Sequence, residues 1–63
     1  MYYRNIEAER ARKGISIERF CKDLGVARST YYSWQKAGNI PATKLIAMAM
    51  YFGVSTDYLL GRV

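Results

Sequence analysis

Apolar residues recur at helical spacing in five stretches of the chain, and breaker residues separate these stretches. The clearest stretch covers residues 16–24 and has one continuous apolar face, made by Ile17, Phe20, Cys21 and Leu24. Gly25 follows at the point where this helix must end, because glycine takes the left-handed conformation after a helix without a Cβ clash. The pattern predicts a helix over 16–24 with Ser16 as its N-cap.

A second helix is predicted over 28–36, and its two sides differ in chemistry. Val26 is the one apolar residue in the turn before it, and we expect this side chain to fill the gap between the two helices. The side expected to face the core carries Thr30, Tyr31 and Trp34. The opposite side carries Arg28, Ser29, Tyr32, Ser33 and Lys36. Two cations, hydroxyl groups and no acid on one side of a helix suit a DNA groove.

Three further helices complete the predicted fold. A first helix covers 2–13, and Arg10 lies on its apolar side, where a guanidinium needs a hydrogen-bond acceptor. A fourth covers about 41–52, and a fifth, very short one follows Ser55 as its N-cap. The sequence therefore predicts an all-α fold of five short helices in one domain over residues 1–63.

The fourth helix is apolar on both of its sides. Its inner side is predicted to carry Leu45, Ile46, Met48, Ala49 and Phe52. The other side carries Ala47, Met50 and Tyr51, which we expect to be exposed, and Tyr58 on the fifth helix is also predicted to face outward. An exposed apolar surface of this kind is typical of a contact with another protein chain.

The chain is basic, and its charges are unevenly placed. Ten Lys and Arg against five Asp and Glu give a net charge of +5, and no acid occurs between Asp23 and Asp57. Such a stretch favours a polyanionic partner, with nucleic acid as the first candidate. The alternative is an ordinary solvated surface with a chance excess of lysine.

Several classes of protein are excluded by composition. The chain has no histidine and a single cysteine, so an ordinary zinc site and a cysteine–histidine dyad are both ruled out, and we expect no metal or cofactor. An enzyme is not expected, because no nucleophile and base can act together. Cys21 is interpreted as a reduced core residue of a cytoplasmic protein. We expect no signal peptide, and the longest apolar run, 45–52, is too short to span a bilayer.

The ordered motifs resemble the phage repressor–Cro (Xre-type) helix-turn-helix family across nearly the whole chain. The resemblance is carried by Arg10, Gly14-Ile15-Ser16, Leu24-Gly25-Val26, Arg28-Ser29-Thr30, Gly53-Val54-Ser55 and Asp57-Tyr58-Leu59-Leu60-Gly61. It implies a compact five-helix, lambda-repressor-like fold with the helix-turn-helix at about 16–36, whose third helix lies in the DNA major groove. It also implies transcriptional control by a repressor that binds an inverted-repeat operator as a homodimer. Such a protein would be cytoplasmic and encoded by a bacterium or a phage.

Three positions depart from the family pattern. Ile17 stands where a phosphate-contacting glutamine commonly begins the second helix, and Ala27 replaces the usual Ser or Thr cap of the third helix. Gln35 occupies a position where the family often has an acid that pairs with the arginine matching Arg10.

The residues expected to contact DNA fall into two groups. Arg28, Ser29, Tyr32 and Ser33 are predicted to read bases, and Ser16, Lys36 and Lys44 to hold phosphates. Arg28 can grip guanine O6 and N7 with both guanidinium nitrogens, although a phosphate contact near the helix start is the alternative. Tyr32 can press its ring on a thymine methyl or donate its hydroxyl to a phosphate.

A dimer interface is predicted near the C-terminal end. Its candidate residues are Val54, Tyr58, Met50 and Tyr51, which offer apolar groups that the core does not obviously use. The same surface supports an alternative function, a protein-interaction module of antitoxin or anti-repressor type that keeps the fold and binds DNA weakly.

Overall fold

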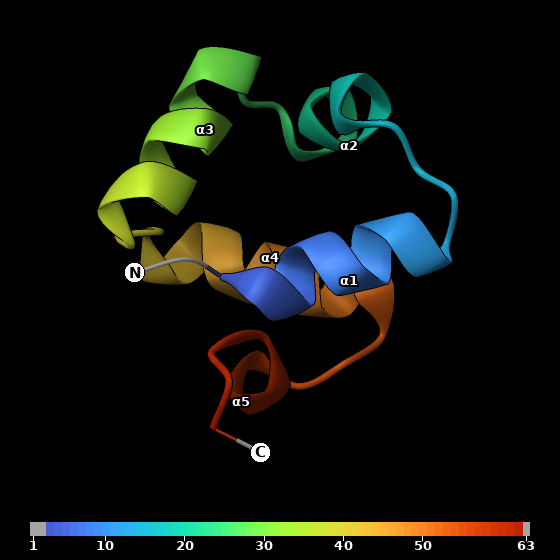
Figure 1. Ribbon diagram of the computed structural model, residues 1–63, viewed down its shortest axis with the longest axis vertical. Helices are drawn as coiled ribbons and strands as arrows, with labels where there is room; N and C mark the ends of the chain where they lie inside the picture. Colours follow the sequence, from blue (N-terminus) through green and yellow to red (C-terminus); the bar gives the residue numbers. More distant parts are fainter. Residues whose placement is uncertain (1–2, 63) are drawn as a thin grey trace.

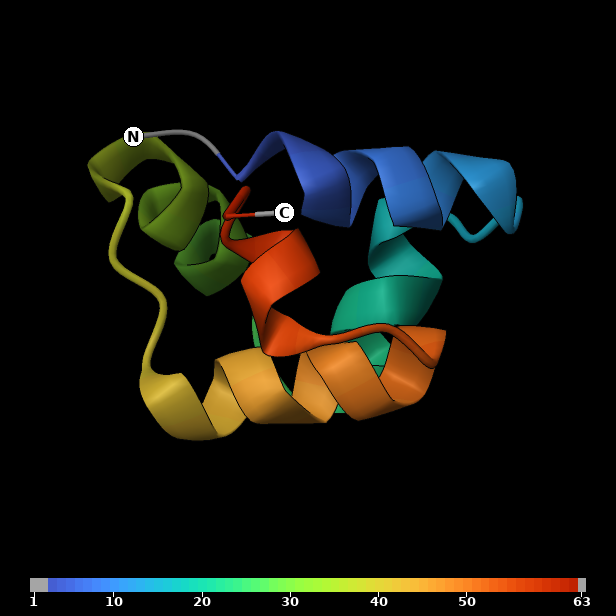
Figure 2. The ribbon, with the colours of Figure 1, turned by 90° about the horizontal axis from the view of Figure 1, so that it is seen from below.

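The computed structural model describes residues 3–62, which form five helices in chain order (Figure 1). These are α1 (Arg4–Arg12), α2 (Ile17–Leu24), α3 (Arg28–Ala37), α4 (Ala42–Phe52) and α5 (Thr56–Leu59). Helices α1 and α4 run in roughly the same direction in both views, with α2 and α3 on one side of this pair and α5 on the other (Figures 1 and 2). The predicted all-α fold of five short helices is confirmed for the described residues. The predicted first helix began at Tyr2, which lies outside them.

The helix ends follow from local sequence. Helix α2 begins after Ser16, whose Oγ accepts the Arg19 N–H at 3.0 Å, and it ends at Gly25 with φ of 72°. Ser55 caps α5 in the same way through the Tyr58 N–H, also at 3.0 Å. Both predicted N-caps are confirmed. Helix α3 begins after Ala27 with no side-chain cap, as that residue type requires.

An aromatic cluster forms the centre of the core. Phe20 on α2 is fully buried and stacks on Phe52 of α4 at 5.2 Å between ring centroids. The edge of the Tyr31 ring from α3 meets Phe20 at 5.5 Å, and the Tyr51 ring lies at 5.6 Å. The rest of the buried apolar core consists of Tyr3, Ile6, Cys21, Ile40, Leu45, Met48, Ala49 and Leu59.

The sides predicted for α3 and α4 are partly wrong. Thr30 is exposed. The inner side of α3 is occupied by Tyr31, Gln35 and the half-buried Trp34, and Thr30 lies about 100° round the helix from Tyr31. Ile46 is 52% exposed, since α1, α2 and α5 pack on the side of α4 that carries Met48 and its neighbours.

Two tyrosines expected to face outward are instead half-buried against the core. The Tyr51 ring packs on Phe20 and Phe52, and its hydroxyl donates to Asp23 Oδ2 at 2.6 Å. Tyr58 also packs against the core, and its hydroxyl donates to the buried Glu9 carboxylate at 3.1 Å. A phenol allows this placement because its ring is apolar while its hydroxyl finds a polar partner.

Candidate nucleic-acid interface

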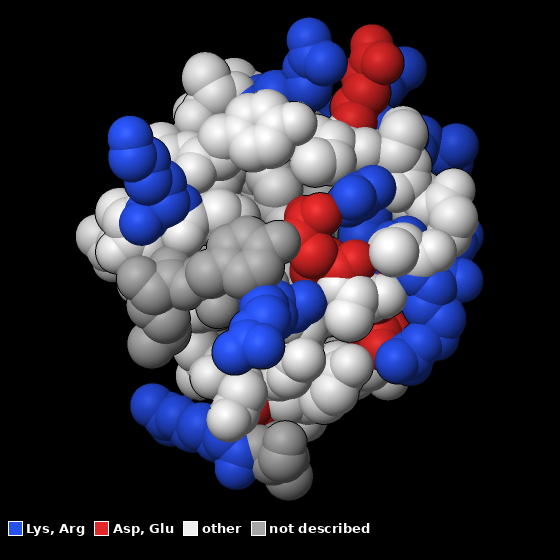
Figure 3. Space-filling view, in the orientation of Figure 1, with Lys and Arg blue, Asp and Glu red and all other residues white. Residues whose placement is uncertain are grey.

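The outer side of α3 is an exposed, polar surface free of acid. All five residues predicted for this side are exposed, namely Arg28, Ser29, Tyr32, Ser33 and Lys36. We call this set the reading face. Tyr32 keeps 51% of its surface open, although its ring lies 6.0 Å from that of Tyr31. Cationic and neutral side chains cover the region of α3 in the space-filling view, where no acid is visible (Figure 3).

The predicted phosphate-holding residues come from three different elements. Ser16 is exposed at the start of α2, and Lys36 is exposed in the last turn of α3. Lys44 is half-buried, and its Nζ donates to the carbonyl of Leu24 at 3.2 Å. Lys44 therefore stabilises the C-terminal end of α2, where the helix dipole favours a cation.

Two cationic residues beside Ser16 are not among those predicted from the sequence to contact DNA. Lys13 and Arg19 line an open hollow of about 430 Å³ together with Ser16 and Tyr51. Arg19 is paired with Asp23 at 3.1 Å, and Lys13 lies 3.6 Å from Glu9. The available signal was the placement of a cation on either side of the N-cap, three residues before it and three after it.

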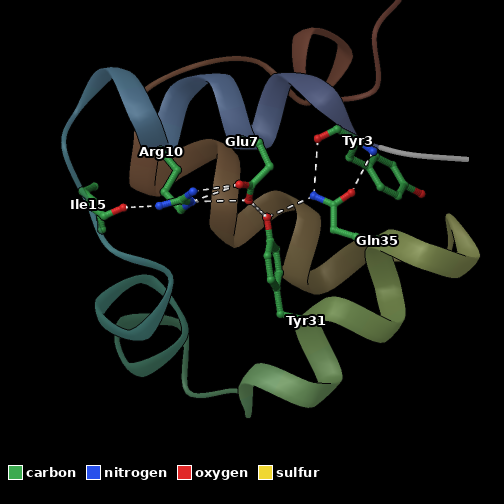
Figure 4. Close-up of polar contacts among 6 residues, drawn as sticks. All are labelled: Tyr3, Glu7, Arg10, Ile15, Tyr31 and Gln35. Atoms are coloured by element: carbon green, nitrogen blue, oxygen red, sulfur yellow. Dashed lines mark hydrogen bonds and ion pairs between the residues drawn. The ribbon is translucent and has the colours of Figure 1, made fainter.

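A chain of polar contacts holds α3 against α1 (Figure 4). The Arg10 guanidinium pairs with the Glu7 carboxylate at 2.8 Å and donates to the Ile15 carbonyl at 2.6 Å. The Tyr31 hydroxyl donates to the same carboxylate and accepts from Gln35 Nε2 at 3.0 Å. The acceptors that Arg10 requires are therefore present: the Glu7 carboxylate on its own helix and the Ile15 carbonyl after that helix, and neither comes from α3.

Within these polar contacts, Glu7 and Tyr31 each keep one protonation state near neutral pH. Burial raises the pKa of the Glu7 carboxyl, but hydrogen bonds from Arg10 and Tyr31 outweigh that effect, so its pKa lies below the ordinary value. Burial and the hydrogen bond to Glu7 raise the pKa of the Tyr31 hydroxyl well above its ordinary value. Glu7 is therefore an ionised acceptor and Tyr31 a protonated donor at neutral pH.

Comparison with known proteins identifies the family. Residues 6–59 match the family described as "Helix-turn-helix", which covers most of the chain. The chain belongs to the helix-turn-helix family. The resemblance to the Xre type is thereby confirmed, and α2 and α3 are its helix-turn-helix.

One curated relative resembles the chain over nearly its whole length. The helix-turn-helix chain is 29% identical over 62 residues to "Uncharacterized HTH-type transcriptional regulator YobD" of Bacillus subtilis (strain 168). The match covers 97% of this chain and 55% of the relative, so the chain spans about half the length of that protein. No solved structure matches the chain.

The apolar surface of the helix-turn-helix domain differs from the one predicted. Val54, Tyr51 and Tyr58 are half-buried and pack against the core, so the premise that the core does not use them is wrong. Met50 and Ile46 are the exposed apolar residues of α4, at 78% and 52%. They lie one turn apart on the same side of the helix.

Two absences hold within the part of the chain that the structure describes. None of the helices over 3–62 is long and apolar enough to cross a membrane. The same residues contain no group of three or more His, Cys, Asp or Glu side chains placed to hold a metal ion.

Proposed function

We propose that this chain is a sequence-specific regulator of transcription that binds double-stranded DNA with α3 in the major groove. The observation that carries the proposal is the reading face, an exposed side of α3 that combines Arg28 and Lys36 with short hydroxyl side chains and no acid. Membership of the helix-turn-helix family supports the docking geometry, because the second helix of this motif enters the major groove. The relative described as a transcriptional regulator supports the biological role.

The residues of the reading face are proposed to make different kinds of contact with DNA. Arg28 begins α3, where it can donate two hydrogen bonds to guanine O6 and N7. Ser29 and Ser33 are short enough for the helix to approach the base edges closely. Tyr32 presents its ring to a thymine methyl or its hydroxyl to a phosphate, and Lys36 holds phosphate at the far end of the helix.

Ser16 contributes to phosphate holding from the start of α2. Unpaired N–H groups there favour an anion, and the exposed Lys13 and Arg19, which are paired with Glu9 and Asp23, lie on either side. Lys44 is proposed to contribute through the charge it places at the end of α2, since its ammonium group already has the Leu24 carbonyl as a partner.

The regulator is proposed to act as a repressor and as a homodimer on an inverted repeat. One recognition helix covers too few base pairs to select a site in a genome, and two copies of this fold place their helices about 34 Å apart, one DNA turn. Among the residues predicted for the interface (Val54, Tyr58, Met50 and Tyr51), only Met50 is largely exposed, so we place the contact around Met50 with Ile46 beside it.

Selection of bound duplexes from a random pool tests the proposed function directly. Repeated rounds with the purified chain are expected to enrich an inverted repeat whose half-sites contain a guanine for Arg28 and lie about one helical turn apart. A pool that stays random after selection, with each duplex bound equally, would contradict sequence-specific reading.

A second candidate function rests on the same exposed apolar residues. A protein-interaction module of antitoxin or anti-repressor type uses such a surface to hold an unlike partner, and Ile46 and Met50 are open enough to serve it. This function predicts that the surface is needed for partner binding while the reading face is dispensable.

Met50→Glu is expected to prevent pairing of two copies on DNA. A carboxylate at the centre of an apolar contact loses its hydration on association, so pairing should weaken by about tenfold or more. Sedimentation with an inverted-repeat duplex should show two copies of the wild type per duplex and one copy of the variant at the same concentration.

Ala11→Glu provides the matched control for this experiment. It adds the same charge at an exposed position of α1, outside the proposed contact, and should still place two copies on the duplex. Two copies of Met50→Glu per duplex at the wild-type concentration would show that the interface lies elsewhere.

A further inference from the structure

Helix α3 is fastened to α1 at two points along its length. At the first, the Tyr31 hydroxyl donates to Glu7. At the second, the Tyr3 N–H donates to Gln35 Oε1 at 2.8 Å, and the Tyr3 hydroxyl donates to the Gly38 carbonyl at 2.9 Å. Figure 4 shows the contact of Tyr31 with Glu7 and that of Gln35 with Tyr3, with Tyr31 and Gln35 reaching from α3 towards α1. Two attachment points more than one turn apart fix the tilt of a helix, whereas one point leaves it free to pivot.

These polar contacts add to the apolar packing of α3. Among the described residues, α2 is the helix whose backbone lies closest to that of α3. The inner side of α3 supplies the Tyr31 ring and the half-buried Trp34 to the core, with the buried Gln35 amide between α3 and the start of α1. The angle between α3 and the rest of the domain therefore depends on these hydrogen bonds as well as on the packing of the Tyr31 ring and Trp34.

The same ion pair also reaches the start of α2. While Glu7 accepts from Tyr31, its partner Arg10 donates to the carbonyl of Ile15, the residue directly before the N-cap Ser16. One carboxylate and one guanidinium therefore connect the element proposed to hold phosphate with the element proposed to read bases. Neither side chain belongs to the reading face.

We propose that Glu7, Arg10 and Tyr31 are positioning residues that hold the reading face in a fixed orientation relative to the start of α2. They control how well the chain discriminates between DNA sequences, and not how strongly it is attracted to DNA as a polyanion. This inference rests on the proposed function. A bidentate contact to guanine requires donor–acceptor distances and angles within a narrow range, so a small change in the tilt of α3 breaks it. Attraction to phosphate falls slowly with distance and survives the same change.

Tyr31→Phe tests the proposal with a single deleted atom. The ring stays in the aromatic core, while the hydrogen bonds to Glu7 and from Gln35 are lost. We expect the ratio of binding constants for the selected duplex and a random duplex to fall about tenfold, with binding to the random duplex changed by less than about twofold.

Tyr58→Phe is the matched control. It also deletes a tyrosine hydroxyl that donates to a carboxylate of α1, in this case Glu9, but it lies on α5 and has no contact with the reading face. A general loss of stability affects both variants, whereas loss of positioning affects only Tyr31→Phe. Equal losses of discrimination in the two variants, or none in Tyr31→Phe, would overturn the proposal.

Amide hydrogen exchange supplies a second measurement that needs no DNA. Exchange in α3 is expected to become about tenfold faster in Tyr31→Phe than in the wild type, with α5 unchanged, and the reverse pattern is expected for Tyr58→Phe. Tyr3→Phe, which removes the bond to Gly38, should accelerate α3 in the same way if Tyr31→Phe does not fold. Uniform acceleration over all helices in these variants would refute positioning.

The two measurements separate failure of this inference from failure of the proposed function. If the wild type binds no duplex, DNA binding is refuted, and the exchange pattern alone decides whether the Tyr31 hydroxyl holds α3. If the wild type selects a sequence and both variants discriminate like it, the proposed function stands and positioning is refuted.

Discussion

Arg28→Ala is expected to lower affinity for the selected duplex by about 1–3 kcal/mol, which corresponds to roughly five- to 150-fold. The residue is exposed at the first position of α3, where its guanidinium is open to a base edge. Loss of a bidentate contact removes discrimination at one base pair only, so the variant should accept all four bases there and keep its other preferences. Competition titrations with duplexes changed at single positions measure this effect.

Lys36→Ala is the control for Arg28→Ala. Both substitutions remove one positive charge from the reading face, but Lys36 lies in the last turn of α3, where we propose a phosphate contact. It should weaken binding to all duplexes about equally and leave the base preferences intact. If Arg28→Ala also weakens every duplex equally, Arg28 is a phosphate contact, and base reading passes to Ser29, Tyr32 or Ser33.

Phe20→Ala is expected to unfold the domain. The ring is fully buried and lies within 5.6 Å of the Tyr31, Tyr51 and Phe52 rings, so its removal leaves a cavity that three aromatic residues surround. Truncation of a buried phenylalanine costs about 3–5 kcal/mol. A single core in a chain of this length rarely supplies more than about 3–5 kcal/mol of stability. Circular dichroism and thermal melting should therefore show no cooperative transition.

Met50→Ala provides the comparison for Phe20→Ala. It shortens a side chain that is 78% exposed, and surface changes of this kind usually alter stability by less than about 0.5 kcal/mol. The variant should melt close to the wild type. A cooperative melt of Phe20→Ala near the wild-type temperature would show that the aromatic cluster does not hold the fold.

The helices and their ends could be predicted because they depend on local chemistry. Ser16, Gly25 and Ser55 each act through backbone groups within five residues of themselves. The reading face could be predicted for a related reason. Its residues are mostly polar and share one side of a helix, so the helical pattern alone places them away from the core. These parts of the structure require no knowledge of which helices pack together.

The sides of α4 and the tyrosine contacts could not be predicted from the same pattern. Ile46 and Tyr51 are both apolar enough for the core, and only the packing of α1, α2 and α5 on α4 decides which one is covered. The hydroxyl of Tyr31 reaches Glu7 across 24 positions of sequence, and that of Tyr58 reaches Glu9 across 49. Long-range hydrogen bonds of this kind leave no periodic signal in the chain.

Titration of a fluorescent duplex at a series of salt concentrations tests the central claim most directly. Each phosphate contact releases condensed counterions, so the logarithm of the binding constant should fall with the logarithm of salt concentration by about 0.9 per contact. With about four to six contacts per bound copy, the expected slope is roughly −3.6 to −5.4 for each copy that binds. Fluorescence anisotropy of the selected and random duplexes should give similar slopes, with the selected duplex bound more tightly at every concentration. A slope near zero, or no binding in dilute buffer, would contradict DNA binding and favour a protein partner at Ile46 and Met50.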